Sequence, residues 1–300
     1  MKKILIIALI AIFACVSVFA EGYTFGLTYW AASDFFETIA QTVTDIAASN
    51  GDRTIVVDAQ QDAQRQLNII DDFIIRGVDA VFLNPVDKDA IRPALIALRN
   101  AGIPIINYDT AVEDLNLVQA FVASDNYGAG VICAEDLNKR LPEGGEIAIL
   151  DYPANSACVE RVQGFIDTIN SNFIIVDQQD AQGKPDPGLE KTTDILTAHP
   201  NLVAIFCAND QCAMGAYGAV VAANKNVLIY GVDGAFESKE AIQRDSRFAG
   251  TAAQSPITMG AKSIEIAYEI LNGEEYEREF AVPTFLITAE NVEPYIGVWQ

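Results

Sequence analysis

The sequence has 300 residues, of which 51% are hydrophobic and 20% are charged, and its formal net charge at pH 7 is −22. This composition is typical of a globular protein with a large core and excludes an intrinsically disordered chain. So acidic a surface repels phosphate backbones, and we therefore expect no nucleic-acid partner.

The first twenty residues predict a secretory signal peptide. Two lysines precede an apolar run over 4–18, and Ala20 ends a small-residue cleavage site before Glu21. Cys15 offers an alternative, because its setting loosely resembles a lipoprotein cleavage box in which the cysteine is lipidated. No later stretch supplies the about 20 apolar residues of a membrane span. We expect an exported, periplasmic protein.

Along the mature sequence, short apolar runs alternate with longer amphipathic segments. The predicted strands cover 23–28, 54–57, 80–83, 103–107, 121–123, 146–150, 173–176, 250–254 and 282–288, with two more inside 204–234. The predicted helices include one capped by Ser33 and others over 64–75, 90–101, 129–140, 158–169, 188–198, 241–244 and 259–271. This alternation predicts βαβ units, and the continuous apolar strands predict mostly parallel sheets covered on both faces.

Two segments far apart in the sequence share one pattern. In the first, a strand ends at Asn84, a helix follows, and a second strand ends at Asp109; the second segment repeats this order with Asn209 and Asp233. Ligands of open parallel sheets bind outside the carboxyl ends of the strands. The recurrence predicts two similar lobes that each direct an amide and a carboxylate at a shared cleft. The alternative is that these residues only start turns or cap helices.

Motifs for common chemistries are missing from the sequence. It has no dinucleotide-binding or phosphate-binding glycine motif and no nucleophile elbow, and its one histidine, His199, lies at a predicted helix end. We therefore expect no cofactor, no metal and no catalytic residue. Four cysteines follow the leader without metal-site spacing: Cys133, Cys158, Cys207 and Cys212. The first two fall at apolar helix positions, which favours buried thiols, and a bridge between the last two is an alternative.

The candidate residues instead supply a set suited to polyhydroxyl ligands. Carboxylates and amides form charge-assisted and neutral hydrogen bonds with adjacent hydroxyl groups. Aromatic side chains at the first strand–helix junction, namely Trp30, Phe35 and Phe36, provide faces for the apolar side of a sugar ring, although core packing is the alternative for Phe36. A glycosidase that uses Asp109 and Asp233 as its two carboxylates is the enzymatic alternative.

The sequence resembles the periplasmic sugar-binding proteins of ABC importers, in the ribose-binding-protein group, over essentially the whole mature chain. The resemblance is carried by DFFETIAQ, AVFLNP, IINYDT, VASDNYGAG, ERVQGF, ILTAHPNLVAIFCANDQCAMGA, YGVDG and AAQSP. It implies that Phe35 and Phe36 stack on the sugar and that Asp109 binds hydroxyls from the N-terminal lobe. It implies the same hydroxyl-binding role, from the C-terminal lobe and hinge, for Arg161, Asn209, Asp233 and Gln254.

Arg161 is also suited by its chemistry, because a planar fork of donors matches vicinal hydroxyl oxygens. A surface arginine paired with Glu160 is the alternative reading of this residue. The resemblance implies a partner, the permease of an ABC transporter in the inner membrane. A secreted sensory module for a chemoreceptor or receptor kinase is the alternative.

Several positions depart from the ribose-binding pattern. Ser33 stands in place of an asparagine and Thr110 in place of an arginine, while Gly183 and Val232 stand where aromatic residues are usual. Tyr152, from the neighbouring loop, is the residue expected to compensate. These departures predict a sugar or polyol other than ribose.

The expected architecture is an α/β fold of two similar Rossmann-like lobes joined by a multi-strand hinge. Residues 21–124 and 255–286 are expected to form the N-terminal lobe. Residues 125–254 and 287–300 are expected to form the C-terminal lobe. Because such a protein must open and close around its ligand, we expect it to act as a monomer.

Overall fold

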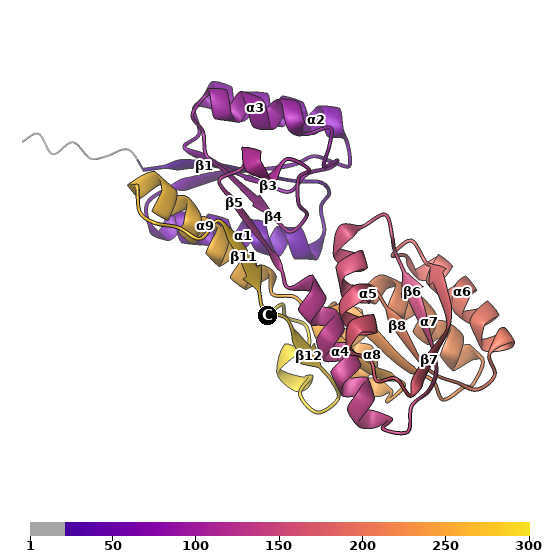
Figure 1. The fold of residues 1–300 in the computed structure, drawn as a ribbon. Helices are drawn as coiled ribbons and strands as arrows, with labels where there is room; N and C mark the ends of the chain where they lie inside the picture. The colour runs from indigo at the N-terminus through magenta and orange to yellow at the C-terminus, as the bar shows by residue number, and fades with distance from the viewer. Residues whose placement is uncertain (1–21) are drawn as a thin grey trace, which may run out of the picture.

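Two α/β lobes joined by a narrow junction make up the protein, as the computed structural model in Figure 1 shows. The structure describes residues 22–300, so the predicted signal peptide and Cys15 lie outside the described residues. The predicted fold of two similar lobes with mostly parallel sheets is confirmed. Within 22–300, no helix is both long enough and apolar enough to span a bilayer.

The N-terminal lobe contains a parallel six-stranded sheet in the order β11-β5-β4-β3-β1-β2. Its strands are β1 (Thr24–Tyr29), β2 (Arg53–Asp58), β3 (Ala80–Leu83), β4 (Ile105–Tyr108), β5 (Ala120–Ser124) and β11 (Glu279–Val282). Its helices are α1 (Asp34–Ser49), α2 (Ala63–Arg76), α3 (Arg92–Asn100) and α9 (Pro256–Asn272), with a short 3₁₀ turn η1 (Leu115–Leu117). Helices α1 and α9 pack on one face of the sheet and α2 and α3 on the other.

The C-terminal lobe repeats this plan with the order β12-β10-β9-β8-β6-β7. Its strands are β6 (Gly145–Asp151), β7 (Phe173–Asp180), β8 (Leu202–Cys207), β9 (Leu228–Asp233), β10 (Phe248–Ala253) and β12 (Phe285–Ile287), of which β12 is antiparallel to β10. Its helices are α4 (Asn126–Arg140), α5 (Ser156–Thr168), α6 (Pro185–Ala198), α7 (Asp210–Ala222) and α8 (Phe236–Arg244), with the 3₁₀ turn η2 (Glu293–Tyr295). Separate hydrophobic clusters cover its two faces.

Six of the helices begin with a side-chain cap at the carboxyl end of the preceding strand or loop. Each cap accepts a hydrogen bond from a backbone N–H of the first helical turn, which otherwise lacks a partner. The capping residues are Ser33, Asp62, Asp125, Asn155, Asn209 and Ser255. Polar residues that follow the strands therefore have a structural role in starting the helices.

The chain passes between the lobes at three places in the described region, and one of them corrects the sequence analysis. The single late strand predicted over 282–288 is two strands, β11 in the first sheet and β12 in the second. Pro283 separates them because it has no N–H with which to continue a ladder. Phe285 already pairs with Ala253 of β10, so the N-terminal lobe ends before Phe285 rather than after residue 286. The other two crossings follow β5 and β10.

Candidate functional site

Arg161 is the centre of the polar cluster on the C-terminal lobe. It lies on α5, is only 5% exposed, and donates to the Asn126 Oδ1 at 2.9 Å and to the Ala208 carbonyl at 3.0 Å. Its Nη1 also donates to Asp233 Oδ1 at 3.0 Å. The alternative of a surface arginine paired with Glu160 is therefore wrong.

Two glycines bring α5 close enough to α4 for this arrangement. A Cβ at Gly130 would lie 1.9 Å from the Arg161 carbonyl oxygen, and one at Gly164 would lie 2.1 Å from the Tyr127 carbonyl oxygen. Only residues without a Cβ permit such an approach. The close packing places the Arg161 side chain against Asn126 at the start of α4.

Asp233 ends β9 and accepts from three groups. Besides Arg161, the Gln254 Nε2 donates to its Oδ1 at 2.7 Å and the Asp210 backbone N–H donates to its Oδ2 at 3.3 Å. Its φ of +140° is rare for a residue with a side chain, and such strain is common at functional sites. Burial raises the pKa of the Asp233 carboxyl, and the Arg161 charge opposes this rise.

A second, deeper carboxylate supports the turn after Asp233. Asp210 is 1% exposed; its Oδ2 accepts from the Ala235 N–H at 2.8 Å and its Oδ1 from the Thr251 hydroxyl, also at 2.8 Å. The Thr251 oxygen in turn accepts from the Gly234 N–H at 3.1 Å. Burial and the nearby charge of Asp233 raise the pKa of Asp210 to about 7. Asp210 was not predicted as a site residue, because an Asp that follows a capping Asn has the sequence pattern of the same turn.

On the N-terminal lobe, Asp109 follows β4 with a left-handed φ of +60°. Its Oδ2 accepts from the Asn84 Nδ2 at 3.2 Å and from the Thr110 hydroxyl at 2.9 Å. Burial raises its pKa, while the charge of Arg161 acts to lower it, so the two lobes bring these groups within electrostatic range. Asn84 is fully buried and also donates to the Tyr108 carbonyl, which fixes its orientation.

The hinge connects the two polar clusters. The hydroxyl of Ser124, the last residue of β5, donates to Gln254 Oε1 at 2.8 Å, and both side chains are buried. This bond directs the amide nitrogen of Gln254 at Asp233. A cavity of about 380 Å³ lies along the hinge, with walls from both lobes that include Asp109, Ser124 and Asn126.

The aromatic residues predicted for the cleft divide between core and surface. Phe36 is buried, and its ring stacks on Tyr29 with centroids 6.0 Å apart, so it belongs mainly to the core. Phe35 is half-buried, and Trp30 is 38% exposed. The ring of Phe35 instead meets Trp299, which the sequence analysis did not single out, with centroids 5.7 Å apart.

Asn209 forms hydrogen bonds within the C-terminal lobe. Its Oδ1 caps α7 by accepting from the Cys212 N–H at 3.0 Å, and its Nδ2 donates to the Gly183 carbonyl at 3.0 Å. Gly183 has a φ of +61°, and a Cβ there would approach the Tyr152 ring at 3.0 Å. Tyr152 therefore occupies the space beside Gly183, as an aromatic residue of this loop.

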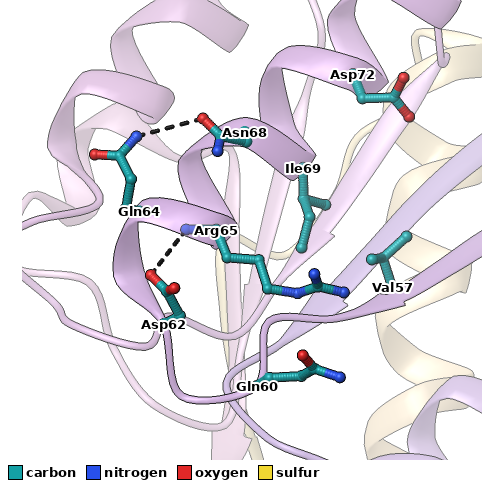
Figure 2. Close-up of a pocket in the computed structure, with 8 residues that line it drawn as sticks. All are labelled: Val57, Gln60, Asp62, Gln64, Arg65, Asn68, Ile69 and Asp72. Atoms are coloured by element: carbon teal, nitrogen blue, oxygen red, sulfur yellow. Dashed lines mark hydrogen bonds between the residues drawn. The ribbon is translucent and has the colours of Figure 1, made fainter.

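A second pocket lies elsewhere and contains none of the predicted site residues. It measures about 530 Å³ and lies between the end of β2 and α2 of the N-terminal lobe. Figure 2 shows Arg65 extending toward Val57, with the Arg65 backbone N–H donating to the capping Asp62. Its other lining side chains include Gln60, Gln64, Asn68, Ile69 and Asp72.

No metal centre accompanies these clusters in the part of the chain that the structure describes. Across 22–300, no group of three or more His, Cys, Asp or Glu side chains could hold a metal ion. The four cysteines of this region are buried and free, so the Cys207–Cys212 bridge is not formed.

Two α/β lobes with polar strand ends that converge at a multi-crossing hinge define a class of ligand-binding proteins. The family model of the periplasmic binding protein domain matches residues 25–275, and the chain belongs to this family. The resemblance inferred from its motifs is confirmed.

Individual relatives extend this comparison. The chain is 32% identical over 268 residues to the ribose import binding protein of Bacillus subtilis, covering 89% of this chain and 87% of that protein. A periplasmic solute-binding protein from Actinobacillus succinogenes with bound D-allose superposes with a TM-score of 0.83 at 28% identity, covering 91% of this chain and 100% of that one. A solute-binding protein from Bacillus halodurans with bound myo-inositol gives 0.81 at 28% identity, covering 91% and 97%.

Proposed function

We propose that this protein is an extracytoplasmic solute receptor that binds a monosaccharide or related polyol between its lobes and delivers it to an ABC transporter permease. The observation that carries the proposal is the pair of opposed clusters, Asp109 with Asn84 on one lobe and Asp233 with Arg161 and Gln254 on the other. Together they offer carboxylate acceptors, amide donors and a guanidinium fork to adjacent hydroxyl groups.

Closure of the lobes follows from this division of the site. A ligand that contacts Asp109 and Asp233 at once stabilises the closed form over the open one, and only this difference in affinity shifts the equilibrium. The three crossings of the hinge suit a bending motion of this kind. The closed form is then the form that a permease recognises.

The ligand that we propose is a sugar or polyol other than ribose. Thr110 supplies a hydroxyl, hydrogen-bonded to Asp109, in place of a cation. Val232 is fully buried beside Asp233 and supplies no aromatic ring. Relatives with bound D-allose and myo-inositol support a six-carbon ligand.

We propose binding without turnover. Arg161, Gln254 and the Asp210 N–H occupy three of the about four lone-pair positions of Asp233, which leaves one for a ligand hydroxyl and disfavours its use as a base. The glycosidase alternative would require a free carboxylate. Incubation with each ligand followed by chromatography tests this point, because an enzyme would release product and lose that activity in D109N.

The remaining expectations complete the proposal. Residues 1–20 act as the export signal to the periplasm, with lipidation of Cys15 as the alternative, and the intact mass of the exported chain distinguishes the two. The receptor acts as a monomer and binds no nucleic acid, in keeping with its net charge of −22. Permease delivery is distinguished from sensing by loss of uptake, rather than of chemotaxis or signalling, when the protein is absent.

A thermal-shift screen tests ligand binding. Purified protein is heated with pentoses, hexoses, cyclitols, acyclic polyols and nucleosides at increasing concentration. A ligand at 100 times its Kd stabilises the folded state by about 2.7 kcal/mol, which raises Tm by roughly 5 °C or more.

The variant to compare is D109N, because it removes one carboxylate and leaves the Arg161–Asp233 pair intact. We expect D109N to lose the shift, while the exposed control D89N keeps it. A panel in which no sugar or polyol shifts the wild-type Tm would refute the proposed ligand class.

A further inference from the structure

The segment that follows η2 places a tryptophan between the two lobes. The Trp299 ring lies 5.7 Å from Phe35 of the N-terminal lobe and 5.2 Å from Phe236 of the C-terminal lobe, measured between centroids. Figure 1 shows this end of the chain at the junction of the lobes, near β11 and β12. Trp299 is therefore the aromatic residue that connects the two sides of the cleft.

Lys239 and Gln300 hold this segment in place. The Lys239 ammonium, on α8, donates to the Val298 carbonyl at 2.6 Å and lies 5.2 Å over the Trp299 ring. The Gln300 Nε2 donates to the Gln254 carbonyl at 2.7 Å, and the Ser255 hydroxyl donates to the Gln300 carbonyl. The tryptophan is thus fixed directly beside Gln254, whose amide is hydrogen-bonded to Asp233.

Two polar atoms of this segment are buried without a partner among the described residues. They are the Trp299 indole Nε1, a donor, and the Gln300 Oε1, an acceptor. A buried polar group without a hydrogen bond is costly and calls for an explanation. A hydroxyl group both donates and accepts, so a polyol satisfies atoms of either kind once a movement of this segment exposes them.

From these observations we propose that Trp299 contacts the ligand and determines specificity for ring-shaped polyols, such as pyranoses and cyclitols. Its indole and Phe35 form an apolar wall against the C–H face of the ring, while its Nε1 donates to a ring hydroxyl. This inference rests on the proposed function, and it assigns the aromatic surface that Val232 and Gly183 do not supply.

The test measures the affinity of W299A and W299F by calorimetry for a cyclic ligand and for an acyclic polyol that bind the wild type. We expect W299A to bind the cyclic ligand about tenfold more weakly or worse, which corresponds to about 1.4 kcal/mol. W299F keeps an aromatic face and should lose less. Affinity for the acyclic polyol should stay within about twofold, because it presents no ring face.

The matched control is Y295A, which removes an aromatic ring from the same segment but contacts Phe285 in the C-terminal lobe. It should leave cyclic-ligand affinity near that of the wild type. The sequence has only two tryptophans, Trp30 and Trp299, so W30F isolates the emission of Trp299. That emission should change on saturation with the cyclic ligand even if W299A does not fold.

The outcomes separate this inference from the proposed function. If wild type binds sugars but W299A binds equally well and the W30F emission does not respond, the role of Trp299 is refuted and the receptor function stands. An equal loss for cyclic and acyclic ligands in W299A would also refute it, because this would indicate an interlobe contact only. A wild type that binds no sugar or polyol refutes the proposed function itself.

Discussion

The buried Arg161 guanidinium and the half-buried Asp233 carboxylate form an ion pair, with Nη1 and Oδ1 3.0 Å apart and side chains 6% and 24% exposed. Arg161 lies on α5, and Asp233 is the last residue of β9. The pair fixes the relative orientation of these two side chains in the C-terminal half of the candidate site. It also ties ligand binding to stability.

Removal of Arg161 should therefore destabilise the protein as well as abolish binding. R161A leaves the half-buried Asp233 without its cation, and the loss of a hydrogen bond to a charged group typically costs about 1.5–3 kcal/mol. The free energy of unfolding in urea measures the effect. R76A breaks an exposed pair with Asp72 and should change stability by less than about 0.5 kcal/mol. Equal stabilities for R161A and R76A would contradict the assignment.

The stability of the protein should fall as pH rises from about 4 to about 7. Burial and the charge of Asp233 raise the pKa of Asp210 to about 7, so the native state holds a proton that the unfolded chain, with an Asp pKa near 3.9, has released. D210N removes this linkage, and its stability relative to wild type should increase by about 2–4 kcal/mol across that window.

Urea titrations between those pH values measure the slope. The raised pKa values of Asp109 and Asp233 act in the same direction, so D210N reduces the slope and leaves part of it. The control is D245N, because hydrogen bonds from Arg247 lower the pKa of Asp245 to about 2, below the window. An unchanged slope in D210N would show that Asp210 is ionised in the native state throughout.

Loss of the Ser124 hydroxyl should weaken ligand binding with little effect on the fold. S124A removes the donor that orients Gln254. The free energy of unfolding should fall by only about 0.5–1.5 kcal/mol, the contribution of one buried hydrogen bond. Calorimetry with the best ligand of the screen should show an affinity several-fold lower. S263A removes a hydroxyl that bonds only within α9, to the Met259 carbonyl, and should bind normally. Equal affinities for the two variants would contradict the orienting role.

The four cysteines should be unreactive in the native protein. All are buried and free, and burial raises the pKa of Cys133 and raises that of Cys158 to about 12. Because the thiolate is the reactive form, a chromogenic disulfide reagent should label none of them until the protein is unfolded. Unfolding without reductant should then expose all four. Labelling of only two would indicate a disulfide.

The strand-end positions of the candidate residues depend on local pattern and could be predicted from the sequence, while their role in ligand binding stays a prediction. Asn84, Asp109 and Asp233 stand at strand ends, and an apolar run followed by a polar residue marks such positions directly. The same local rule could not say which hydrogen bonds these side chains make within the protein. Both polar atoms of the Asn209 amide form hydrogen bonds within the protein. Phe36 packs on Tyr29 in the core.

Other features depend on contacts between distant segments, which a single sequence does not reveal. Trp299 meets Phe35 from the opposite end of the chain, and Asp210 accepts a hydrogen bond from Thr251 of β10. The apolar run over 282–288 reads as one strand, although Pro283 marks the place where the chain changes sheets. The strand with which each half of this run pairs, rather than its composition, determines the sheet to which it belongs.

The division of β11 and β12 between the lobes has a consequence for the order of folding. β11 covers the open edge of β5, and β12 covers that of β10, so both sheets take their final strand from residues 279–287. During synthesis, neither lobe can complete its six-stranded sheet until residues 279–287 have been made.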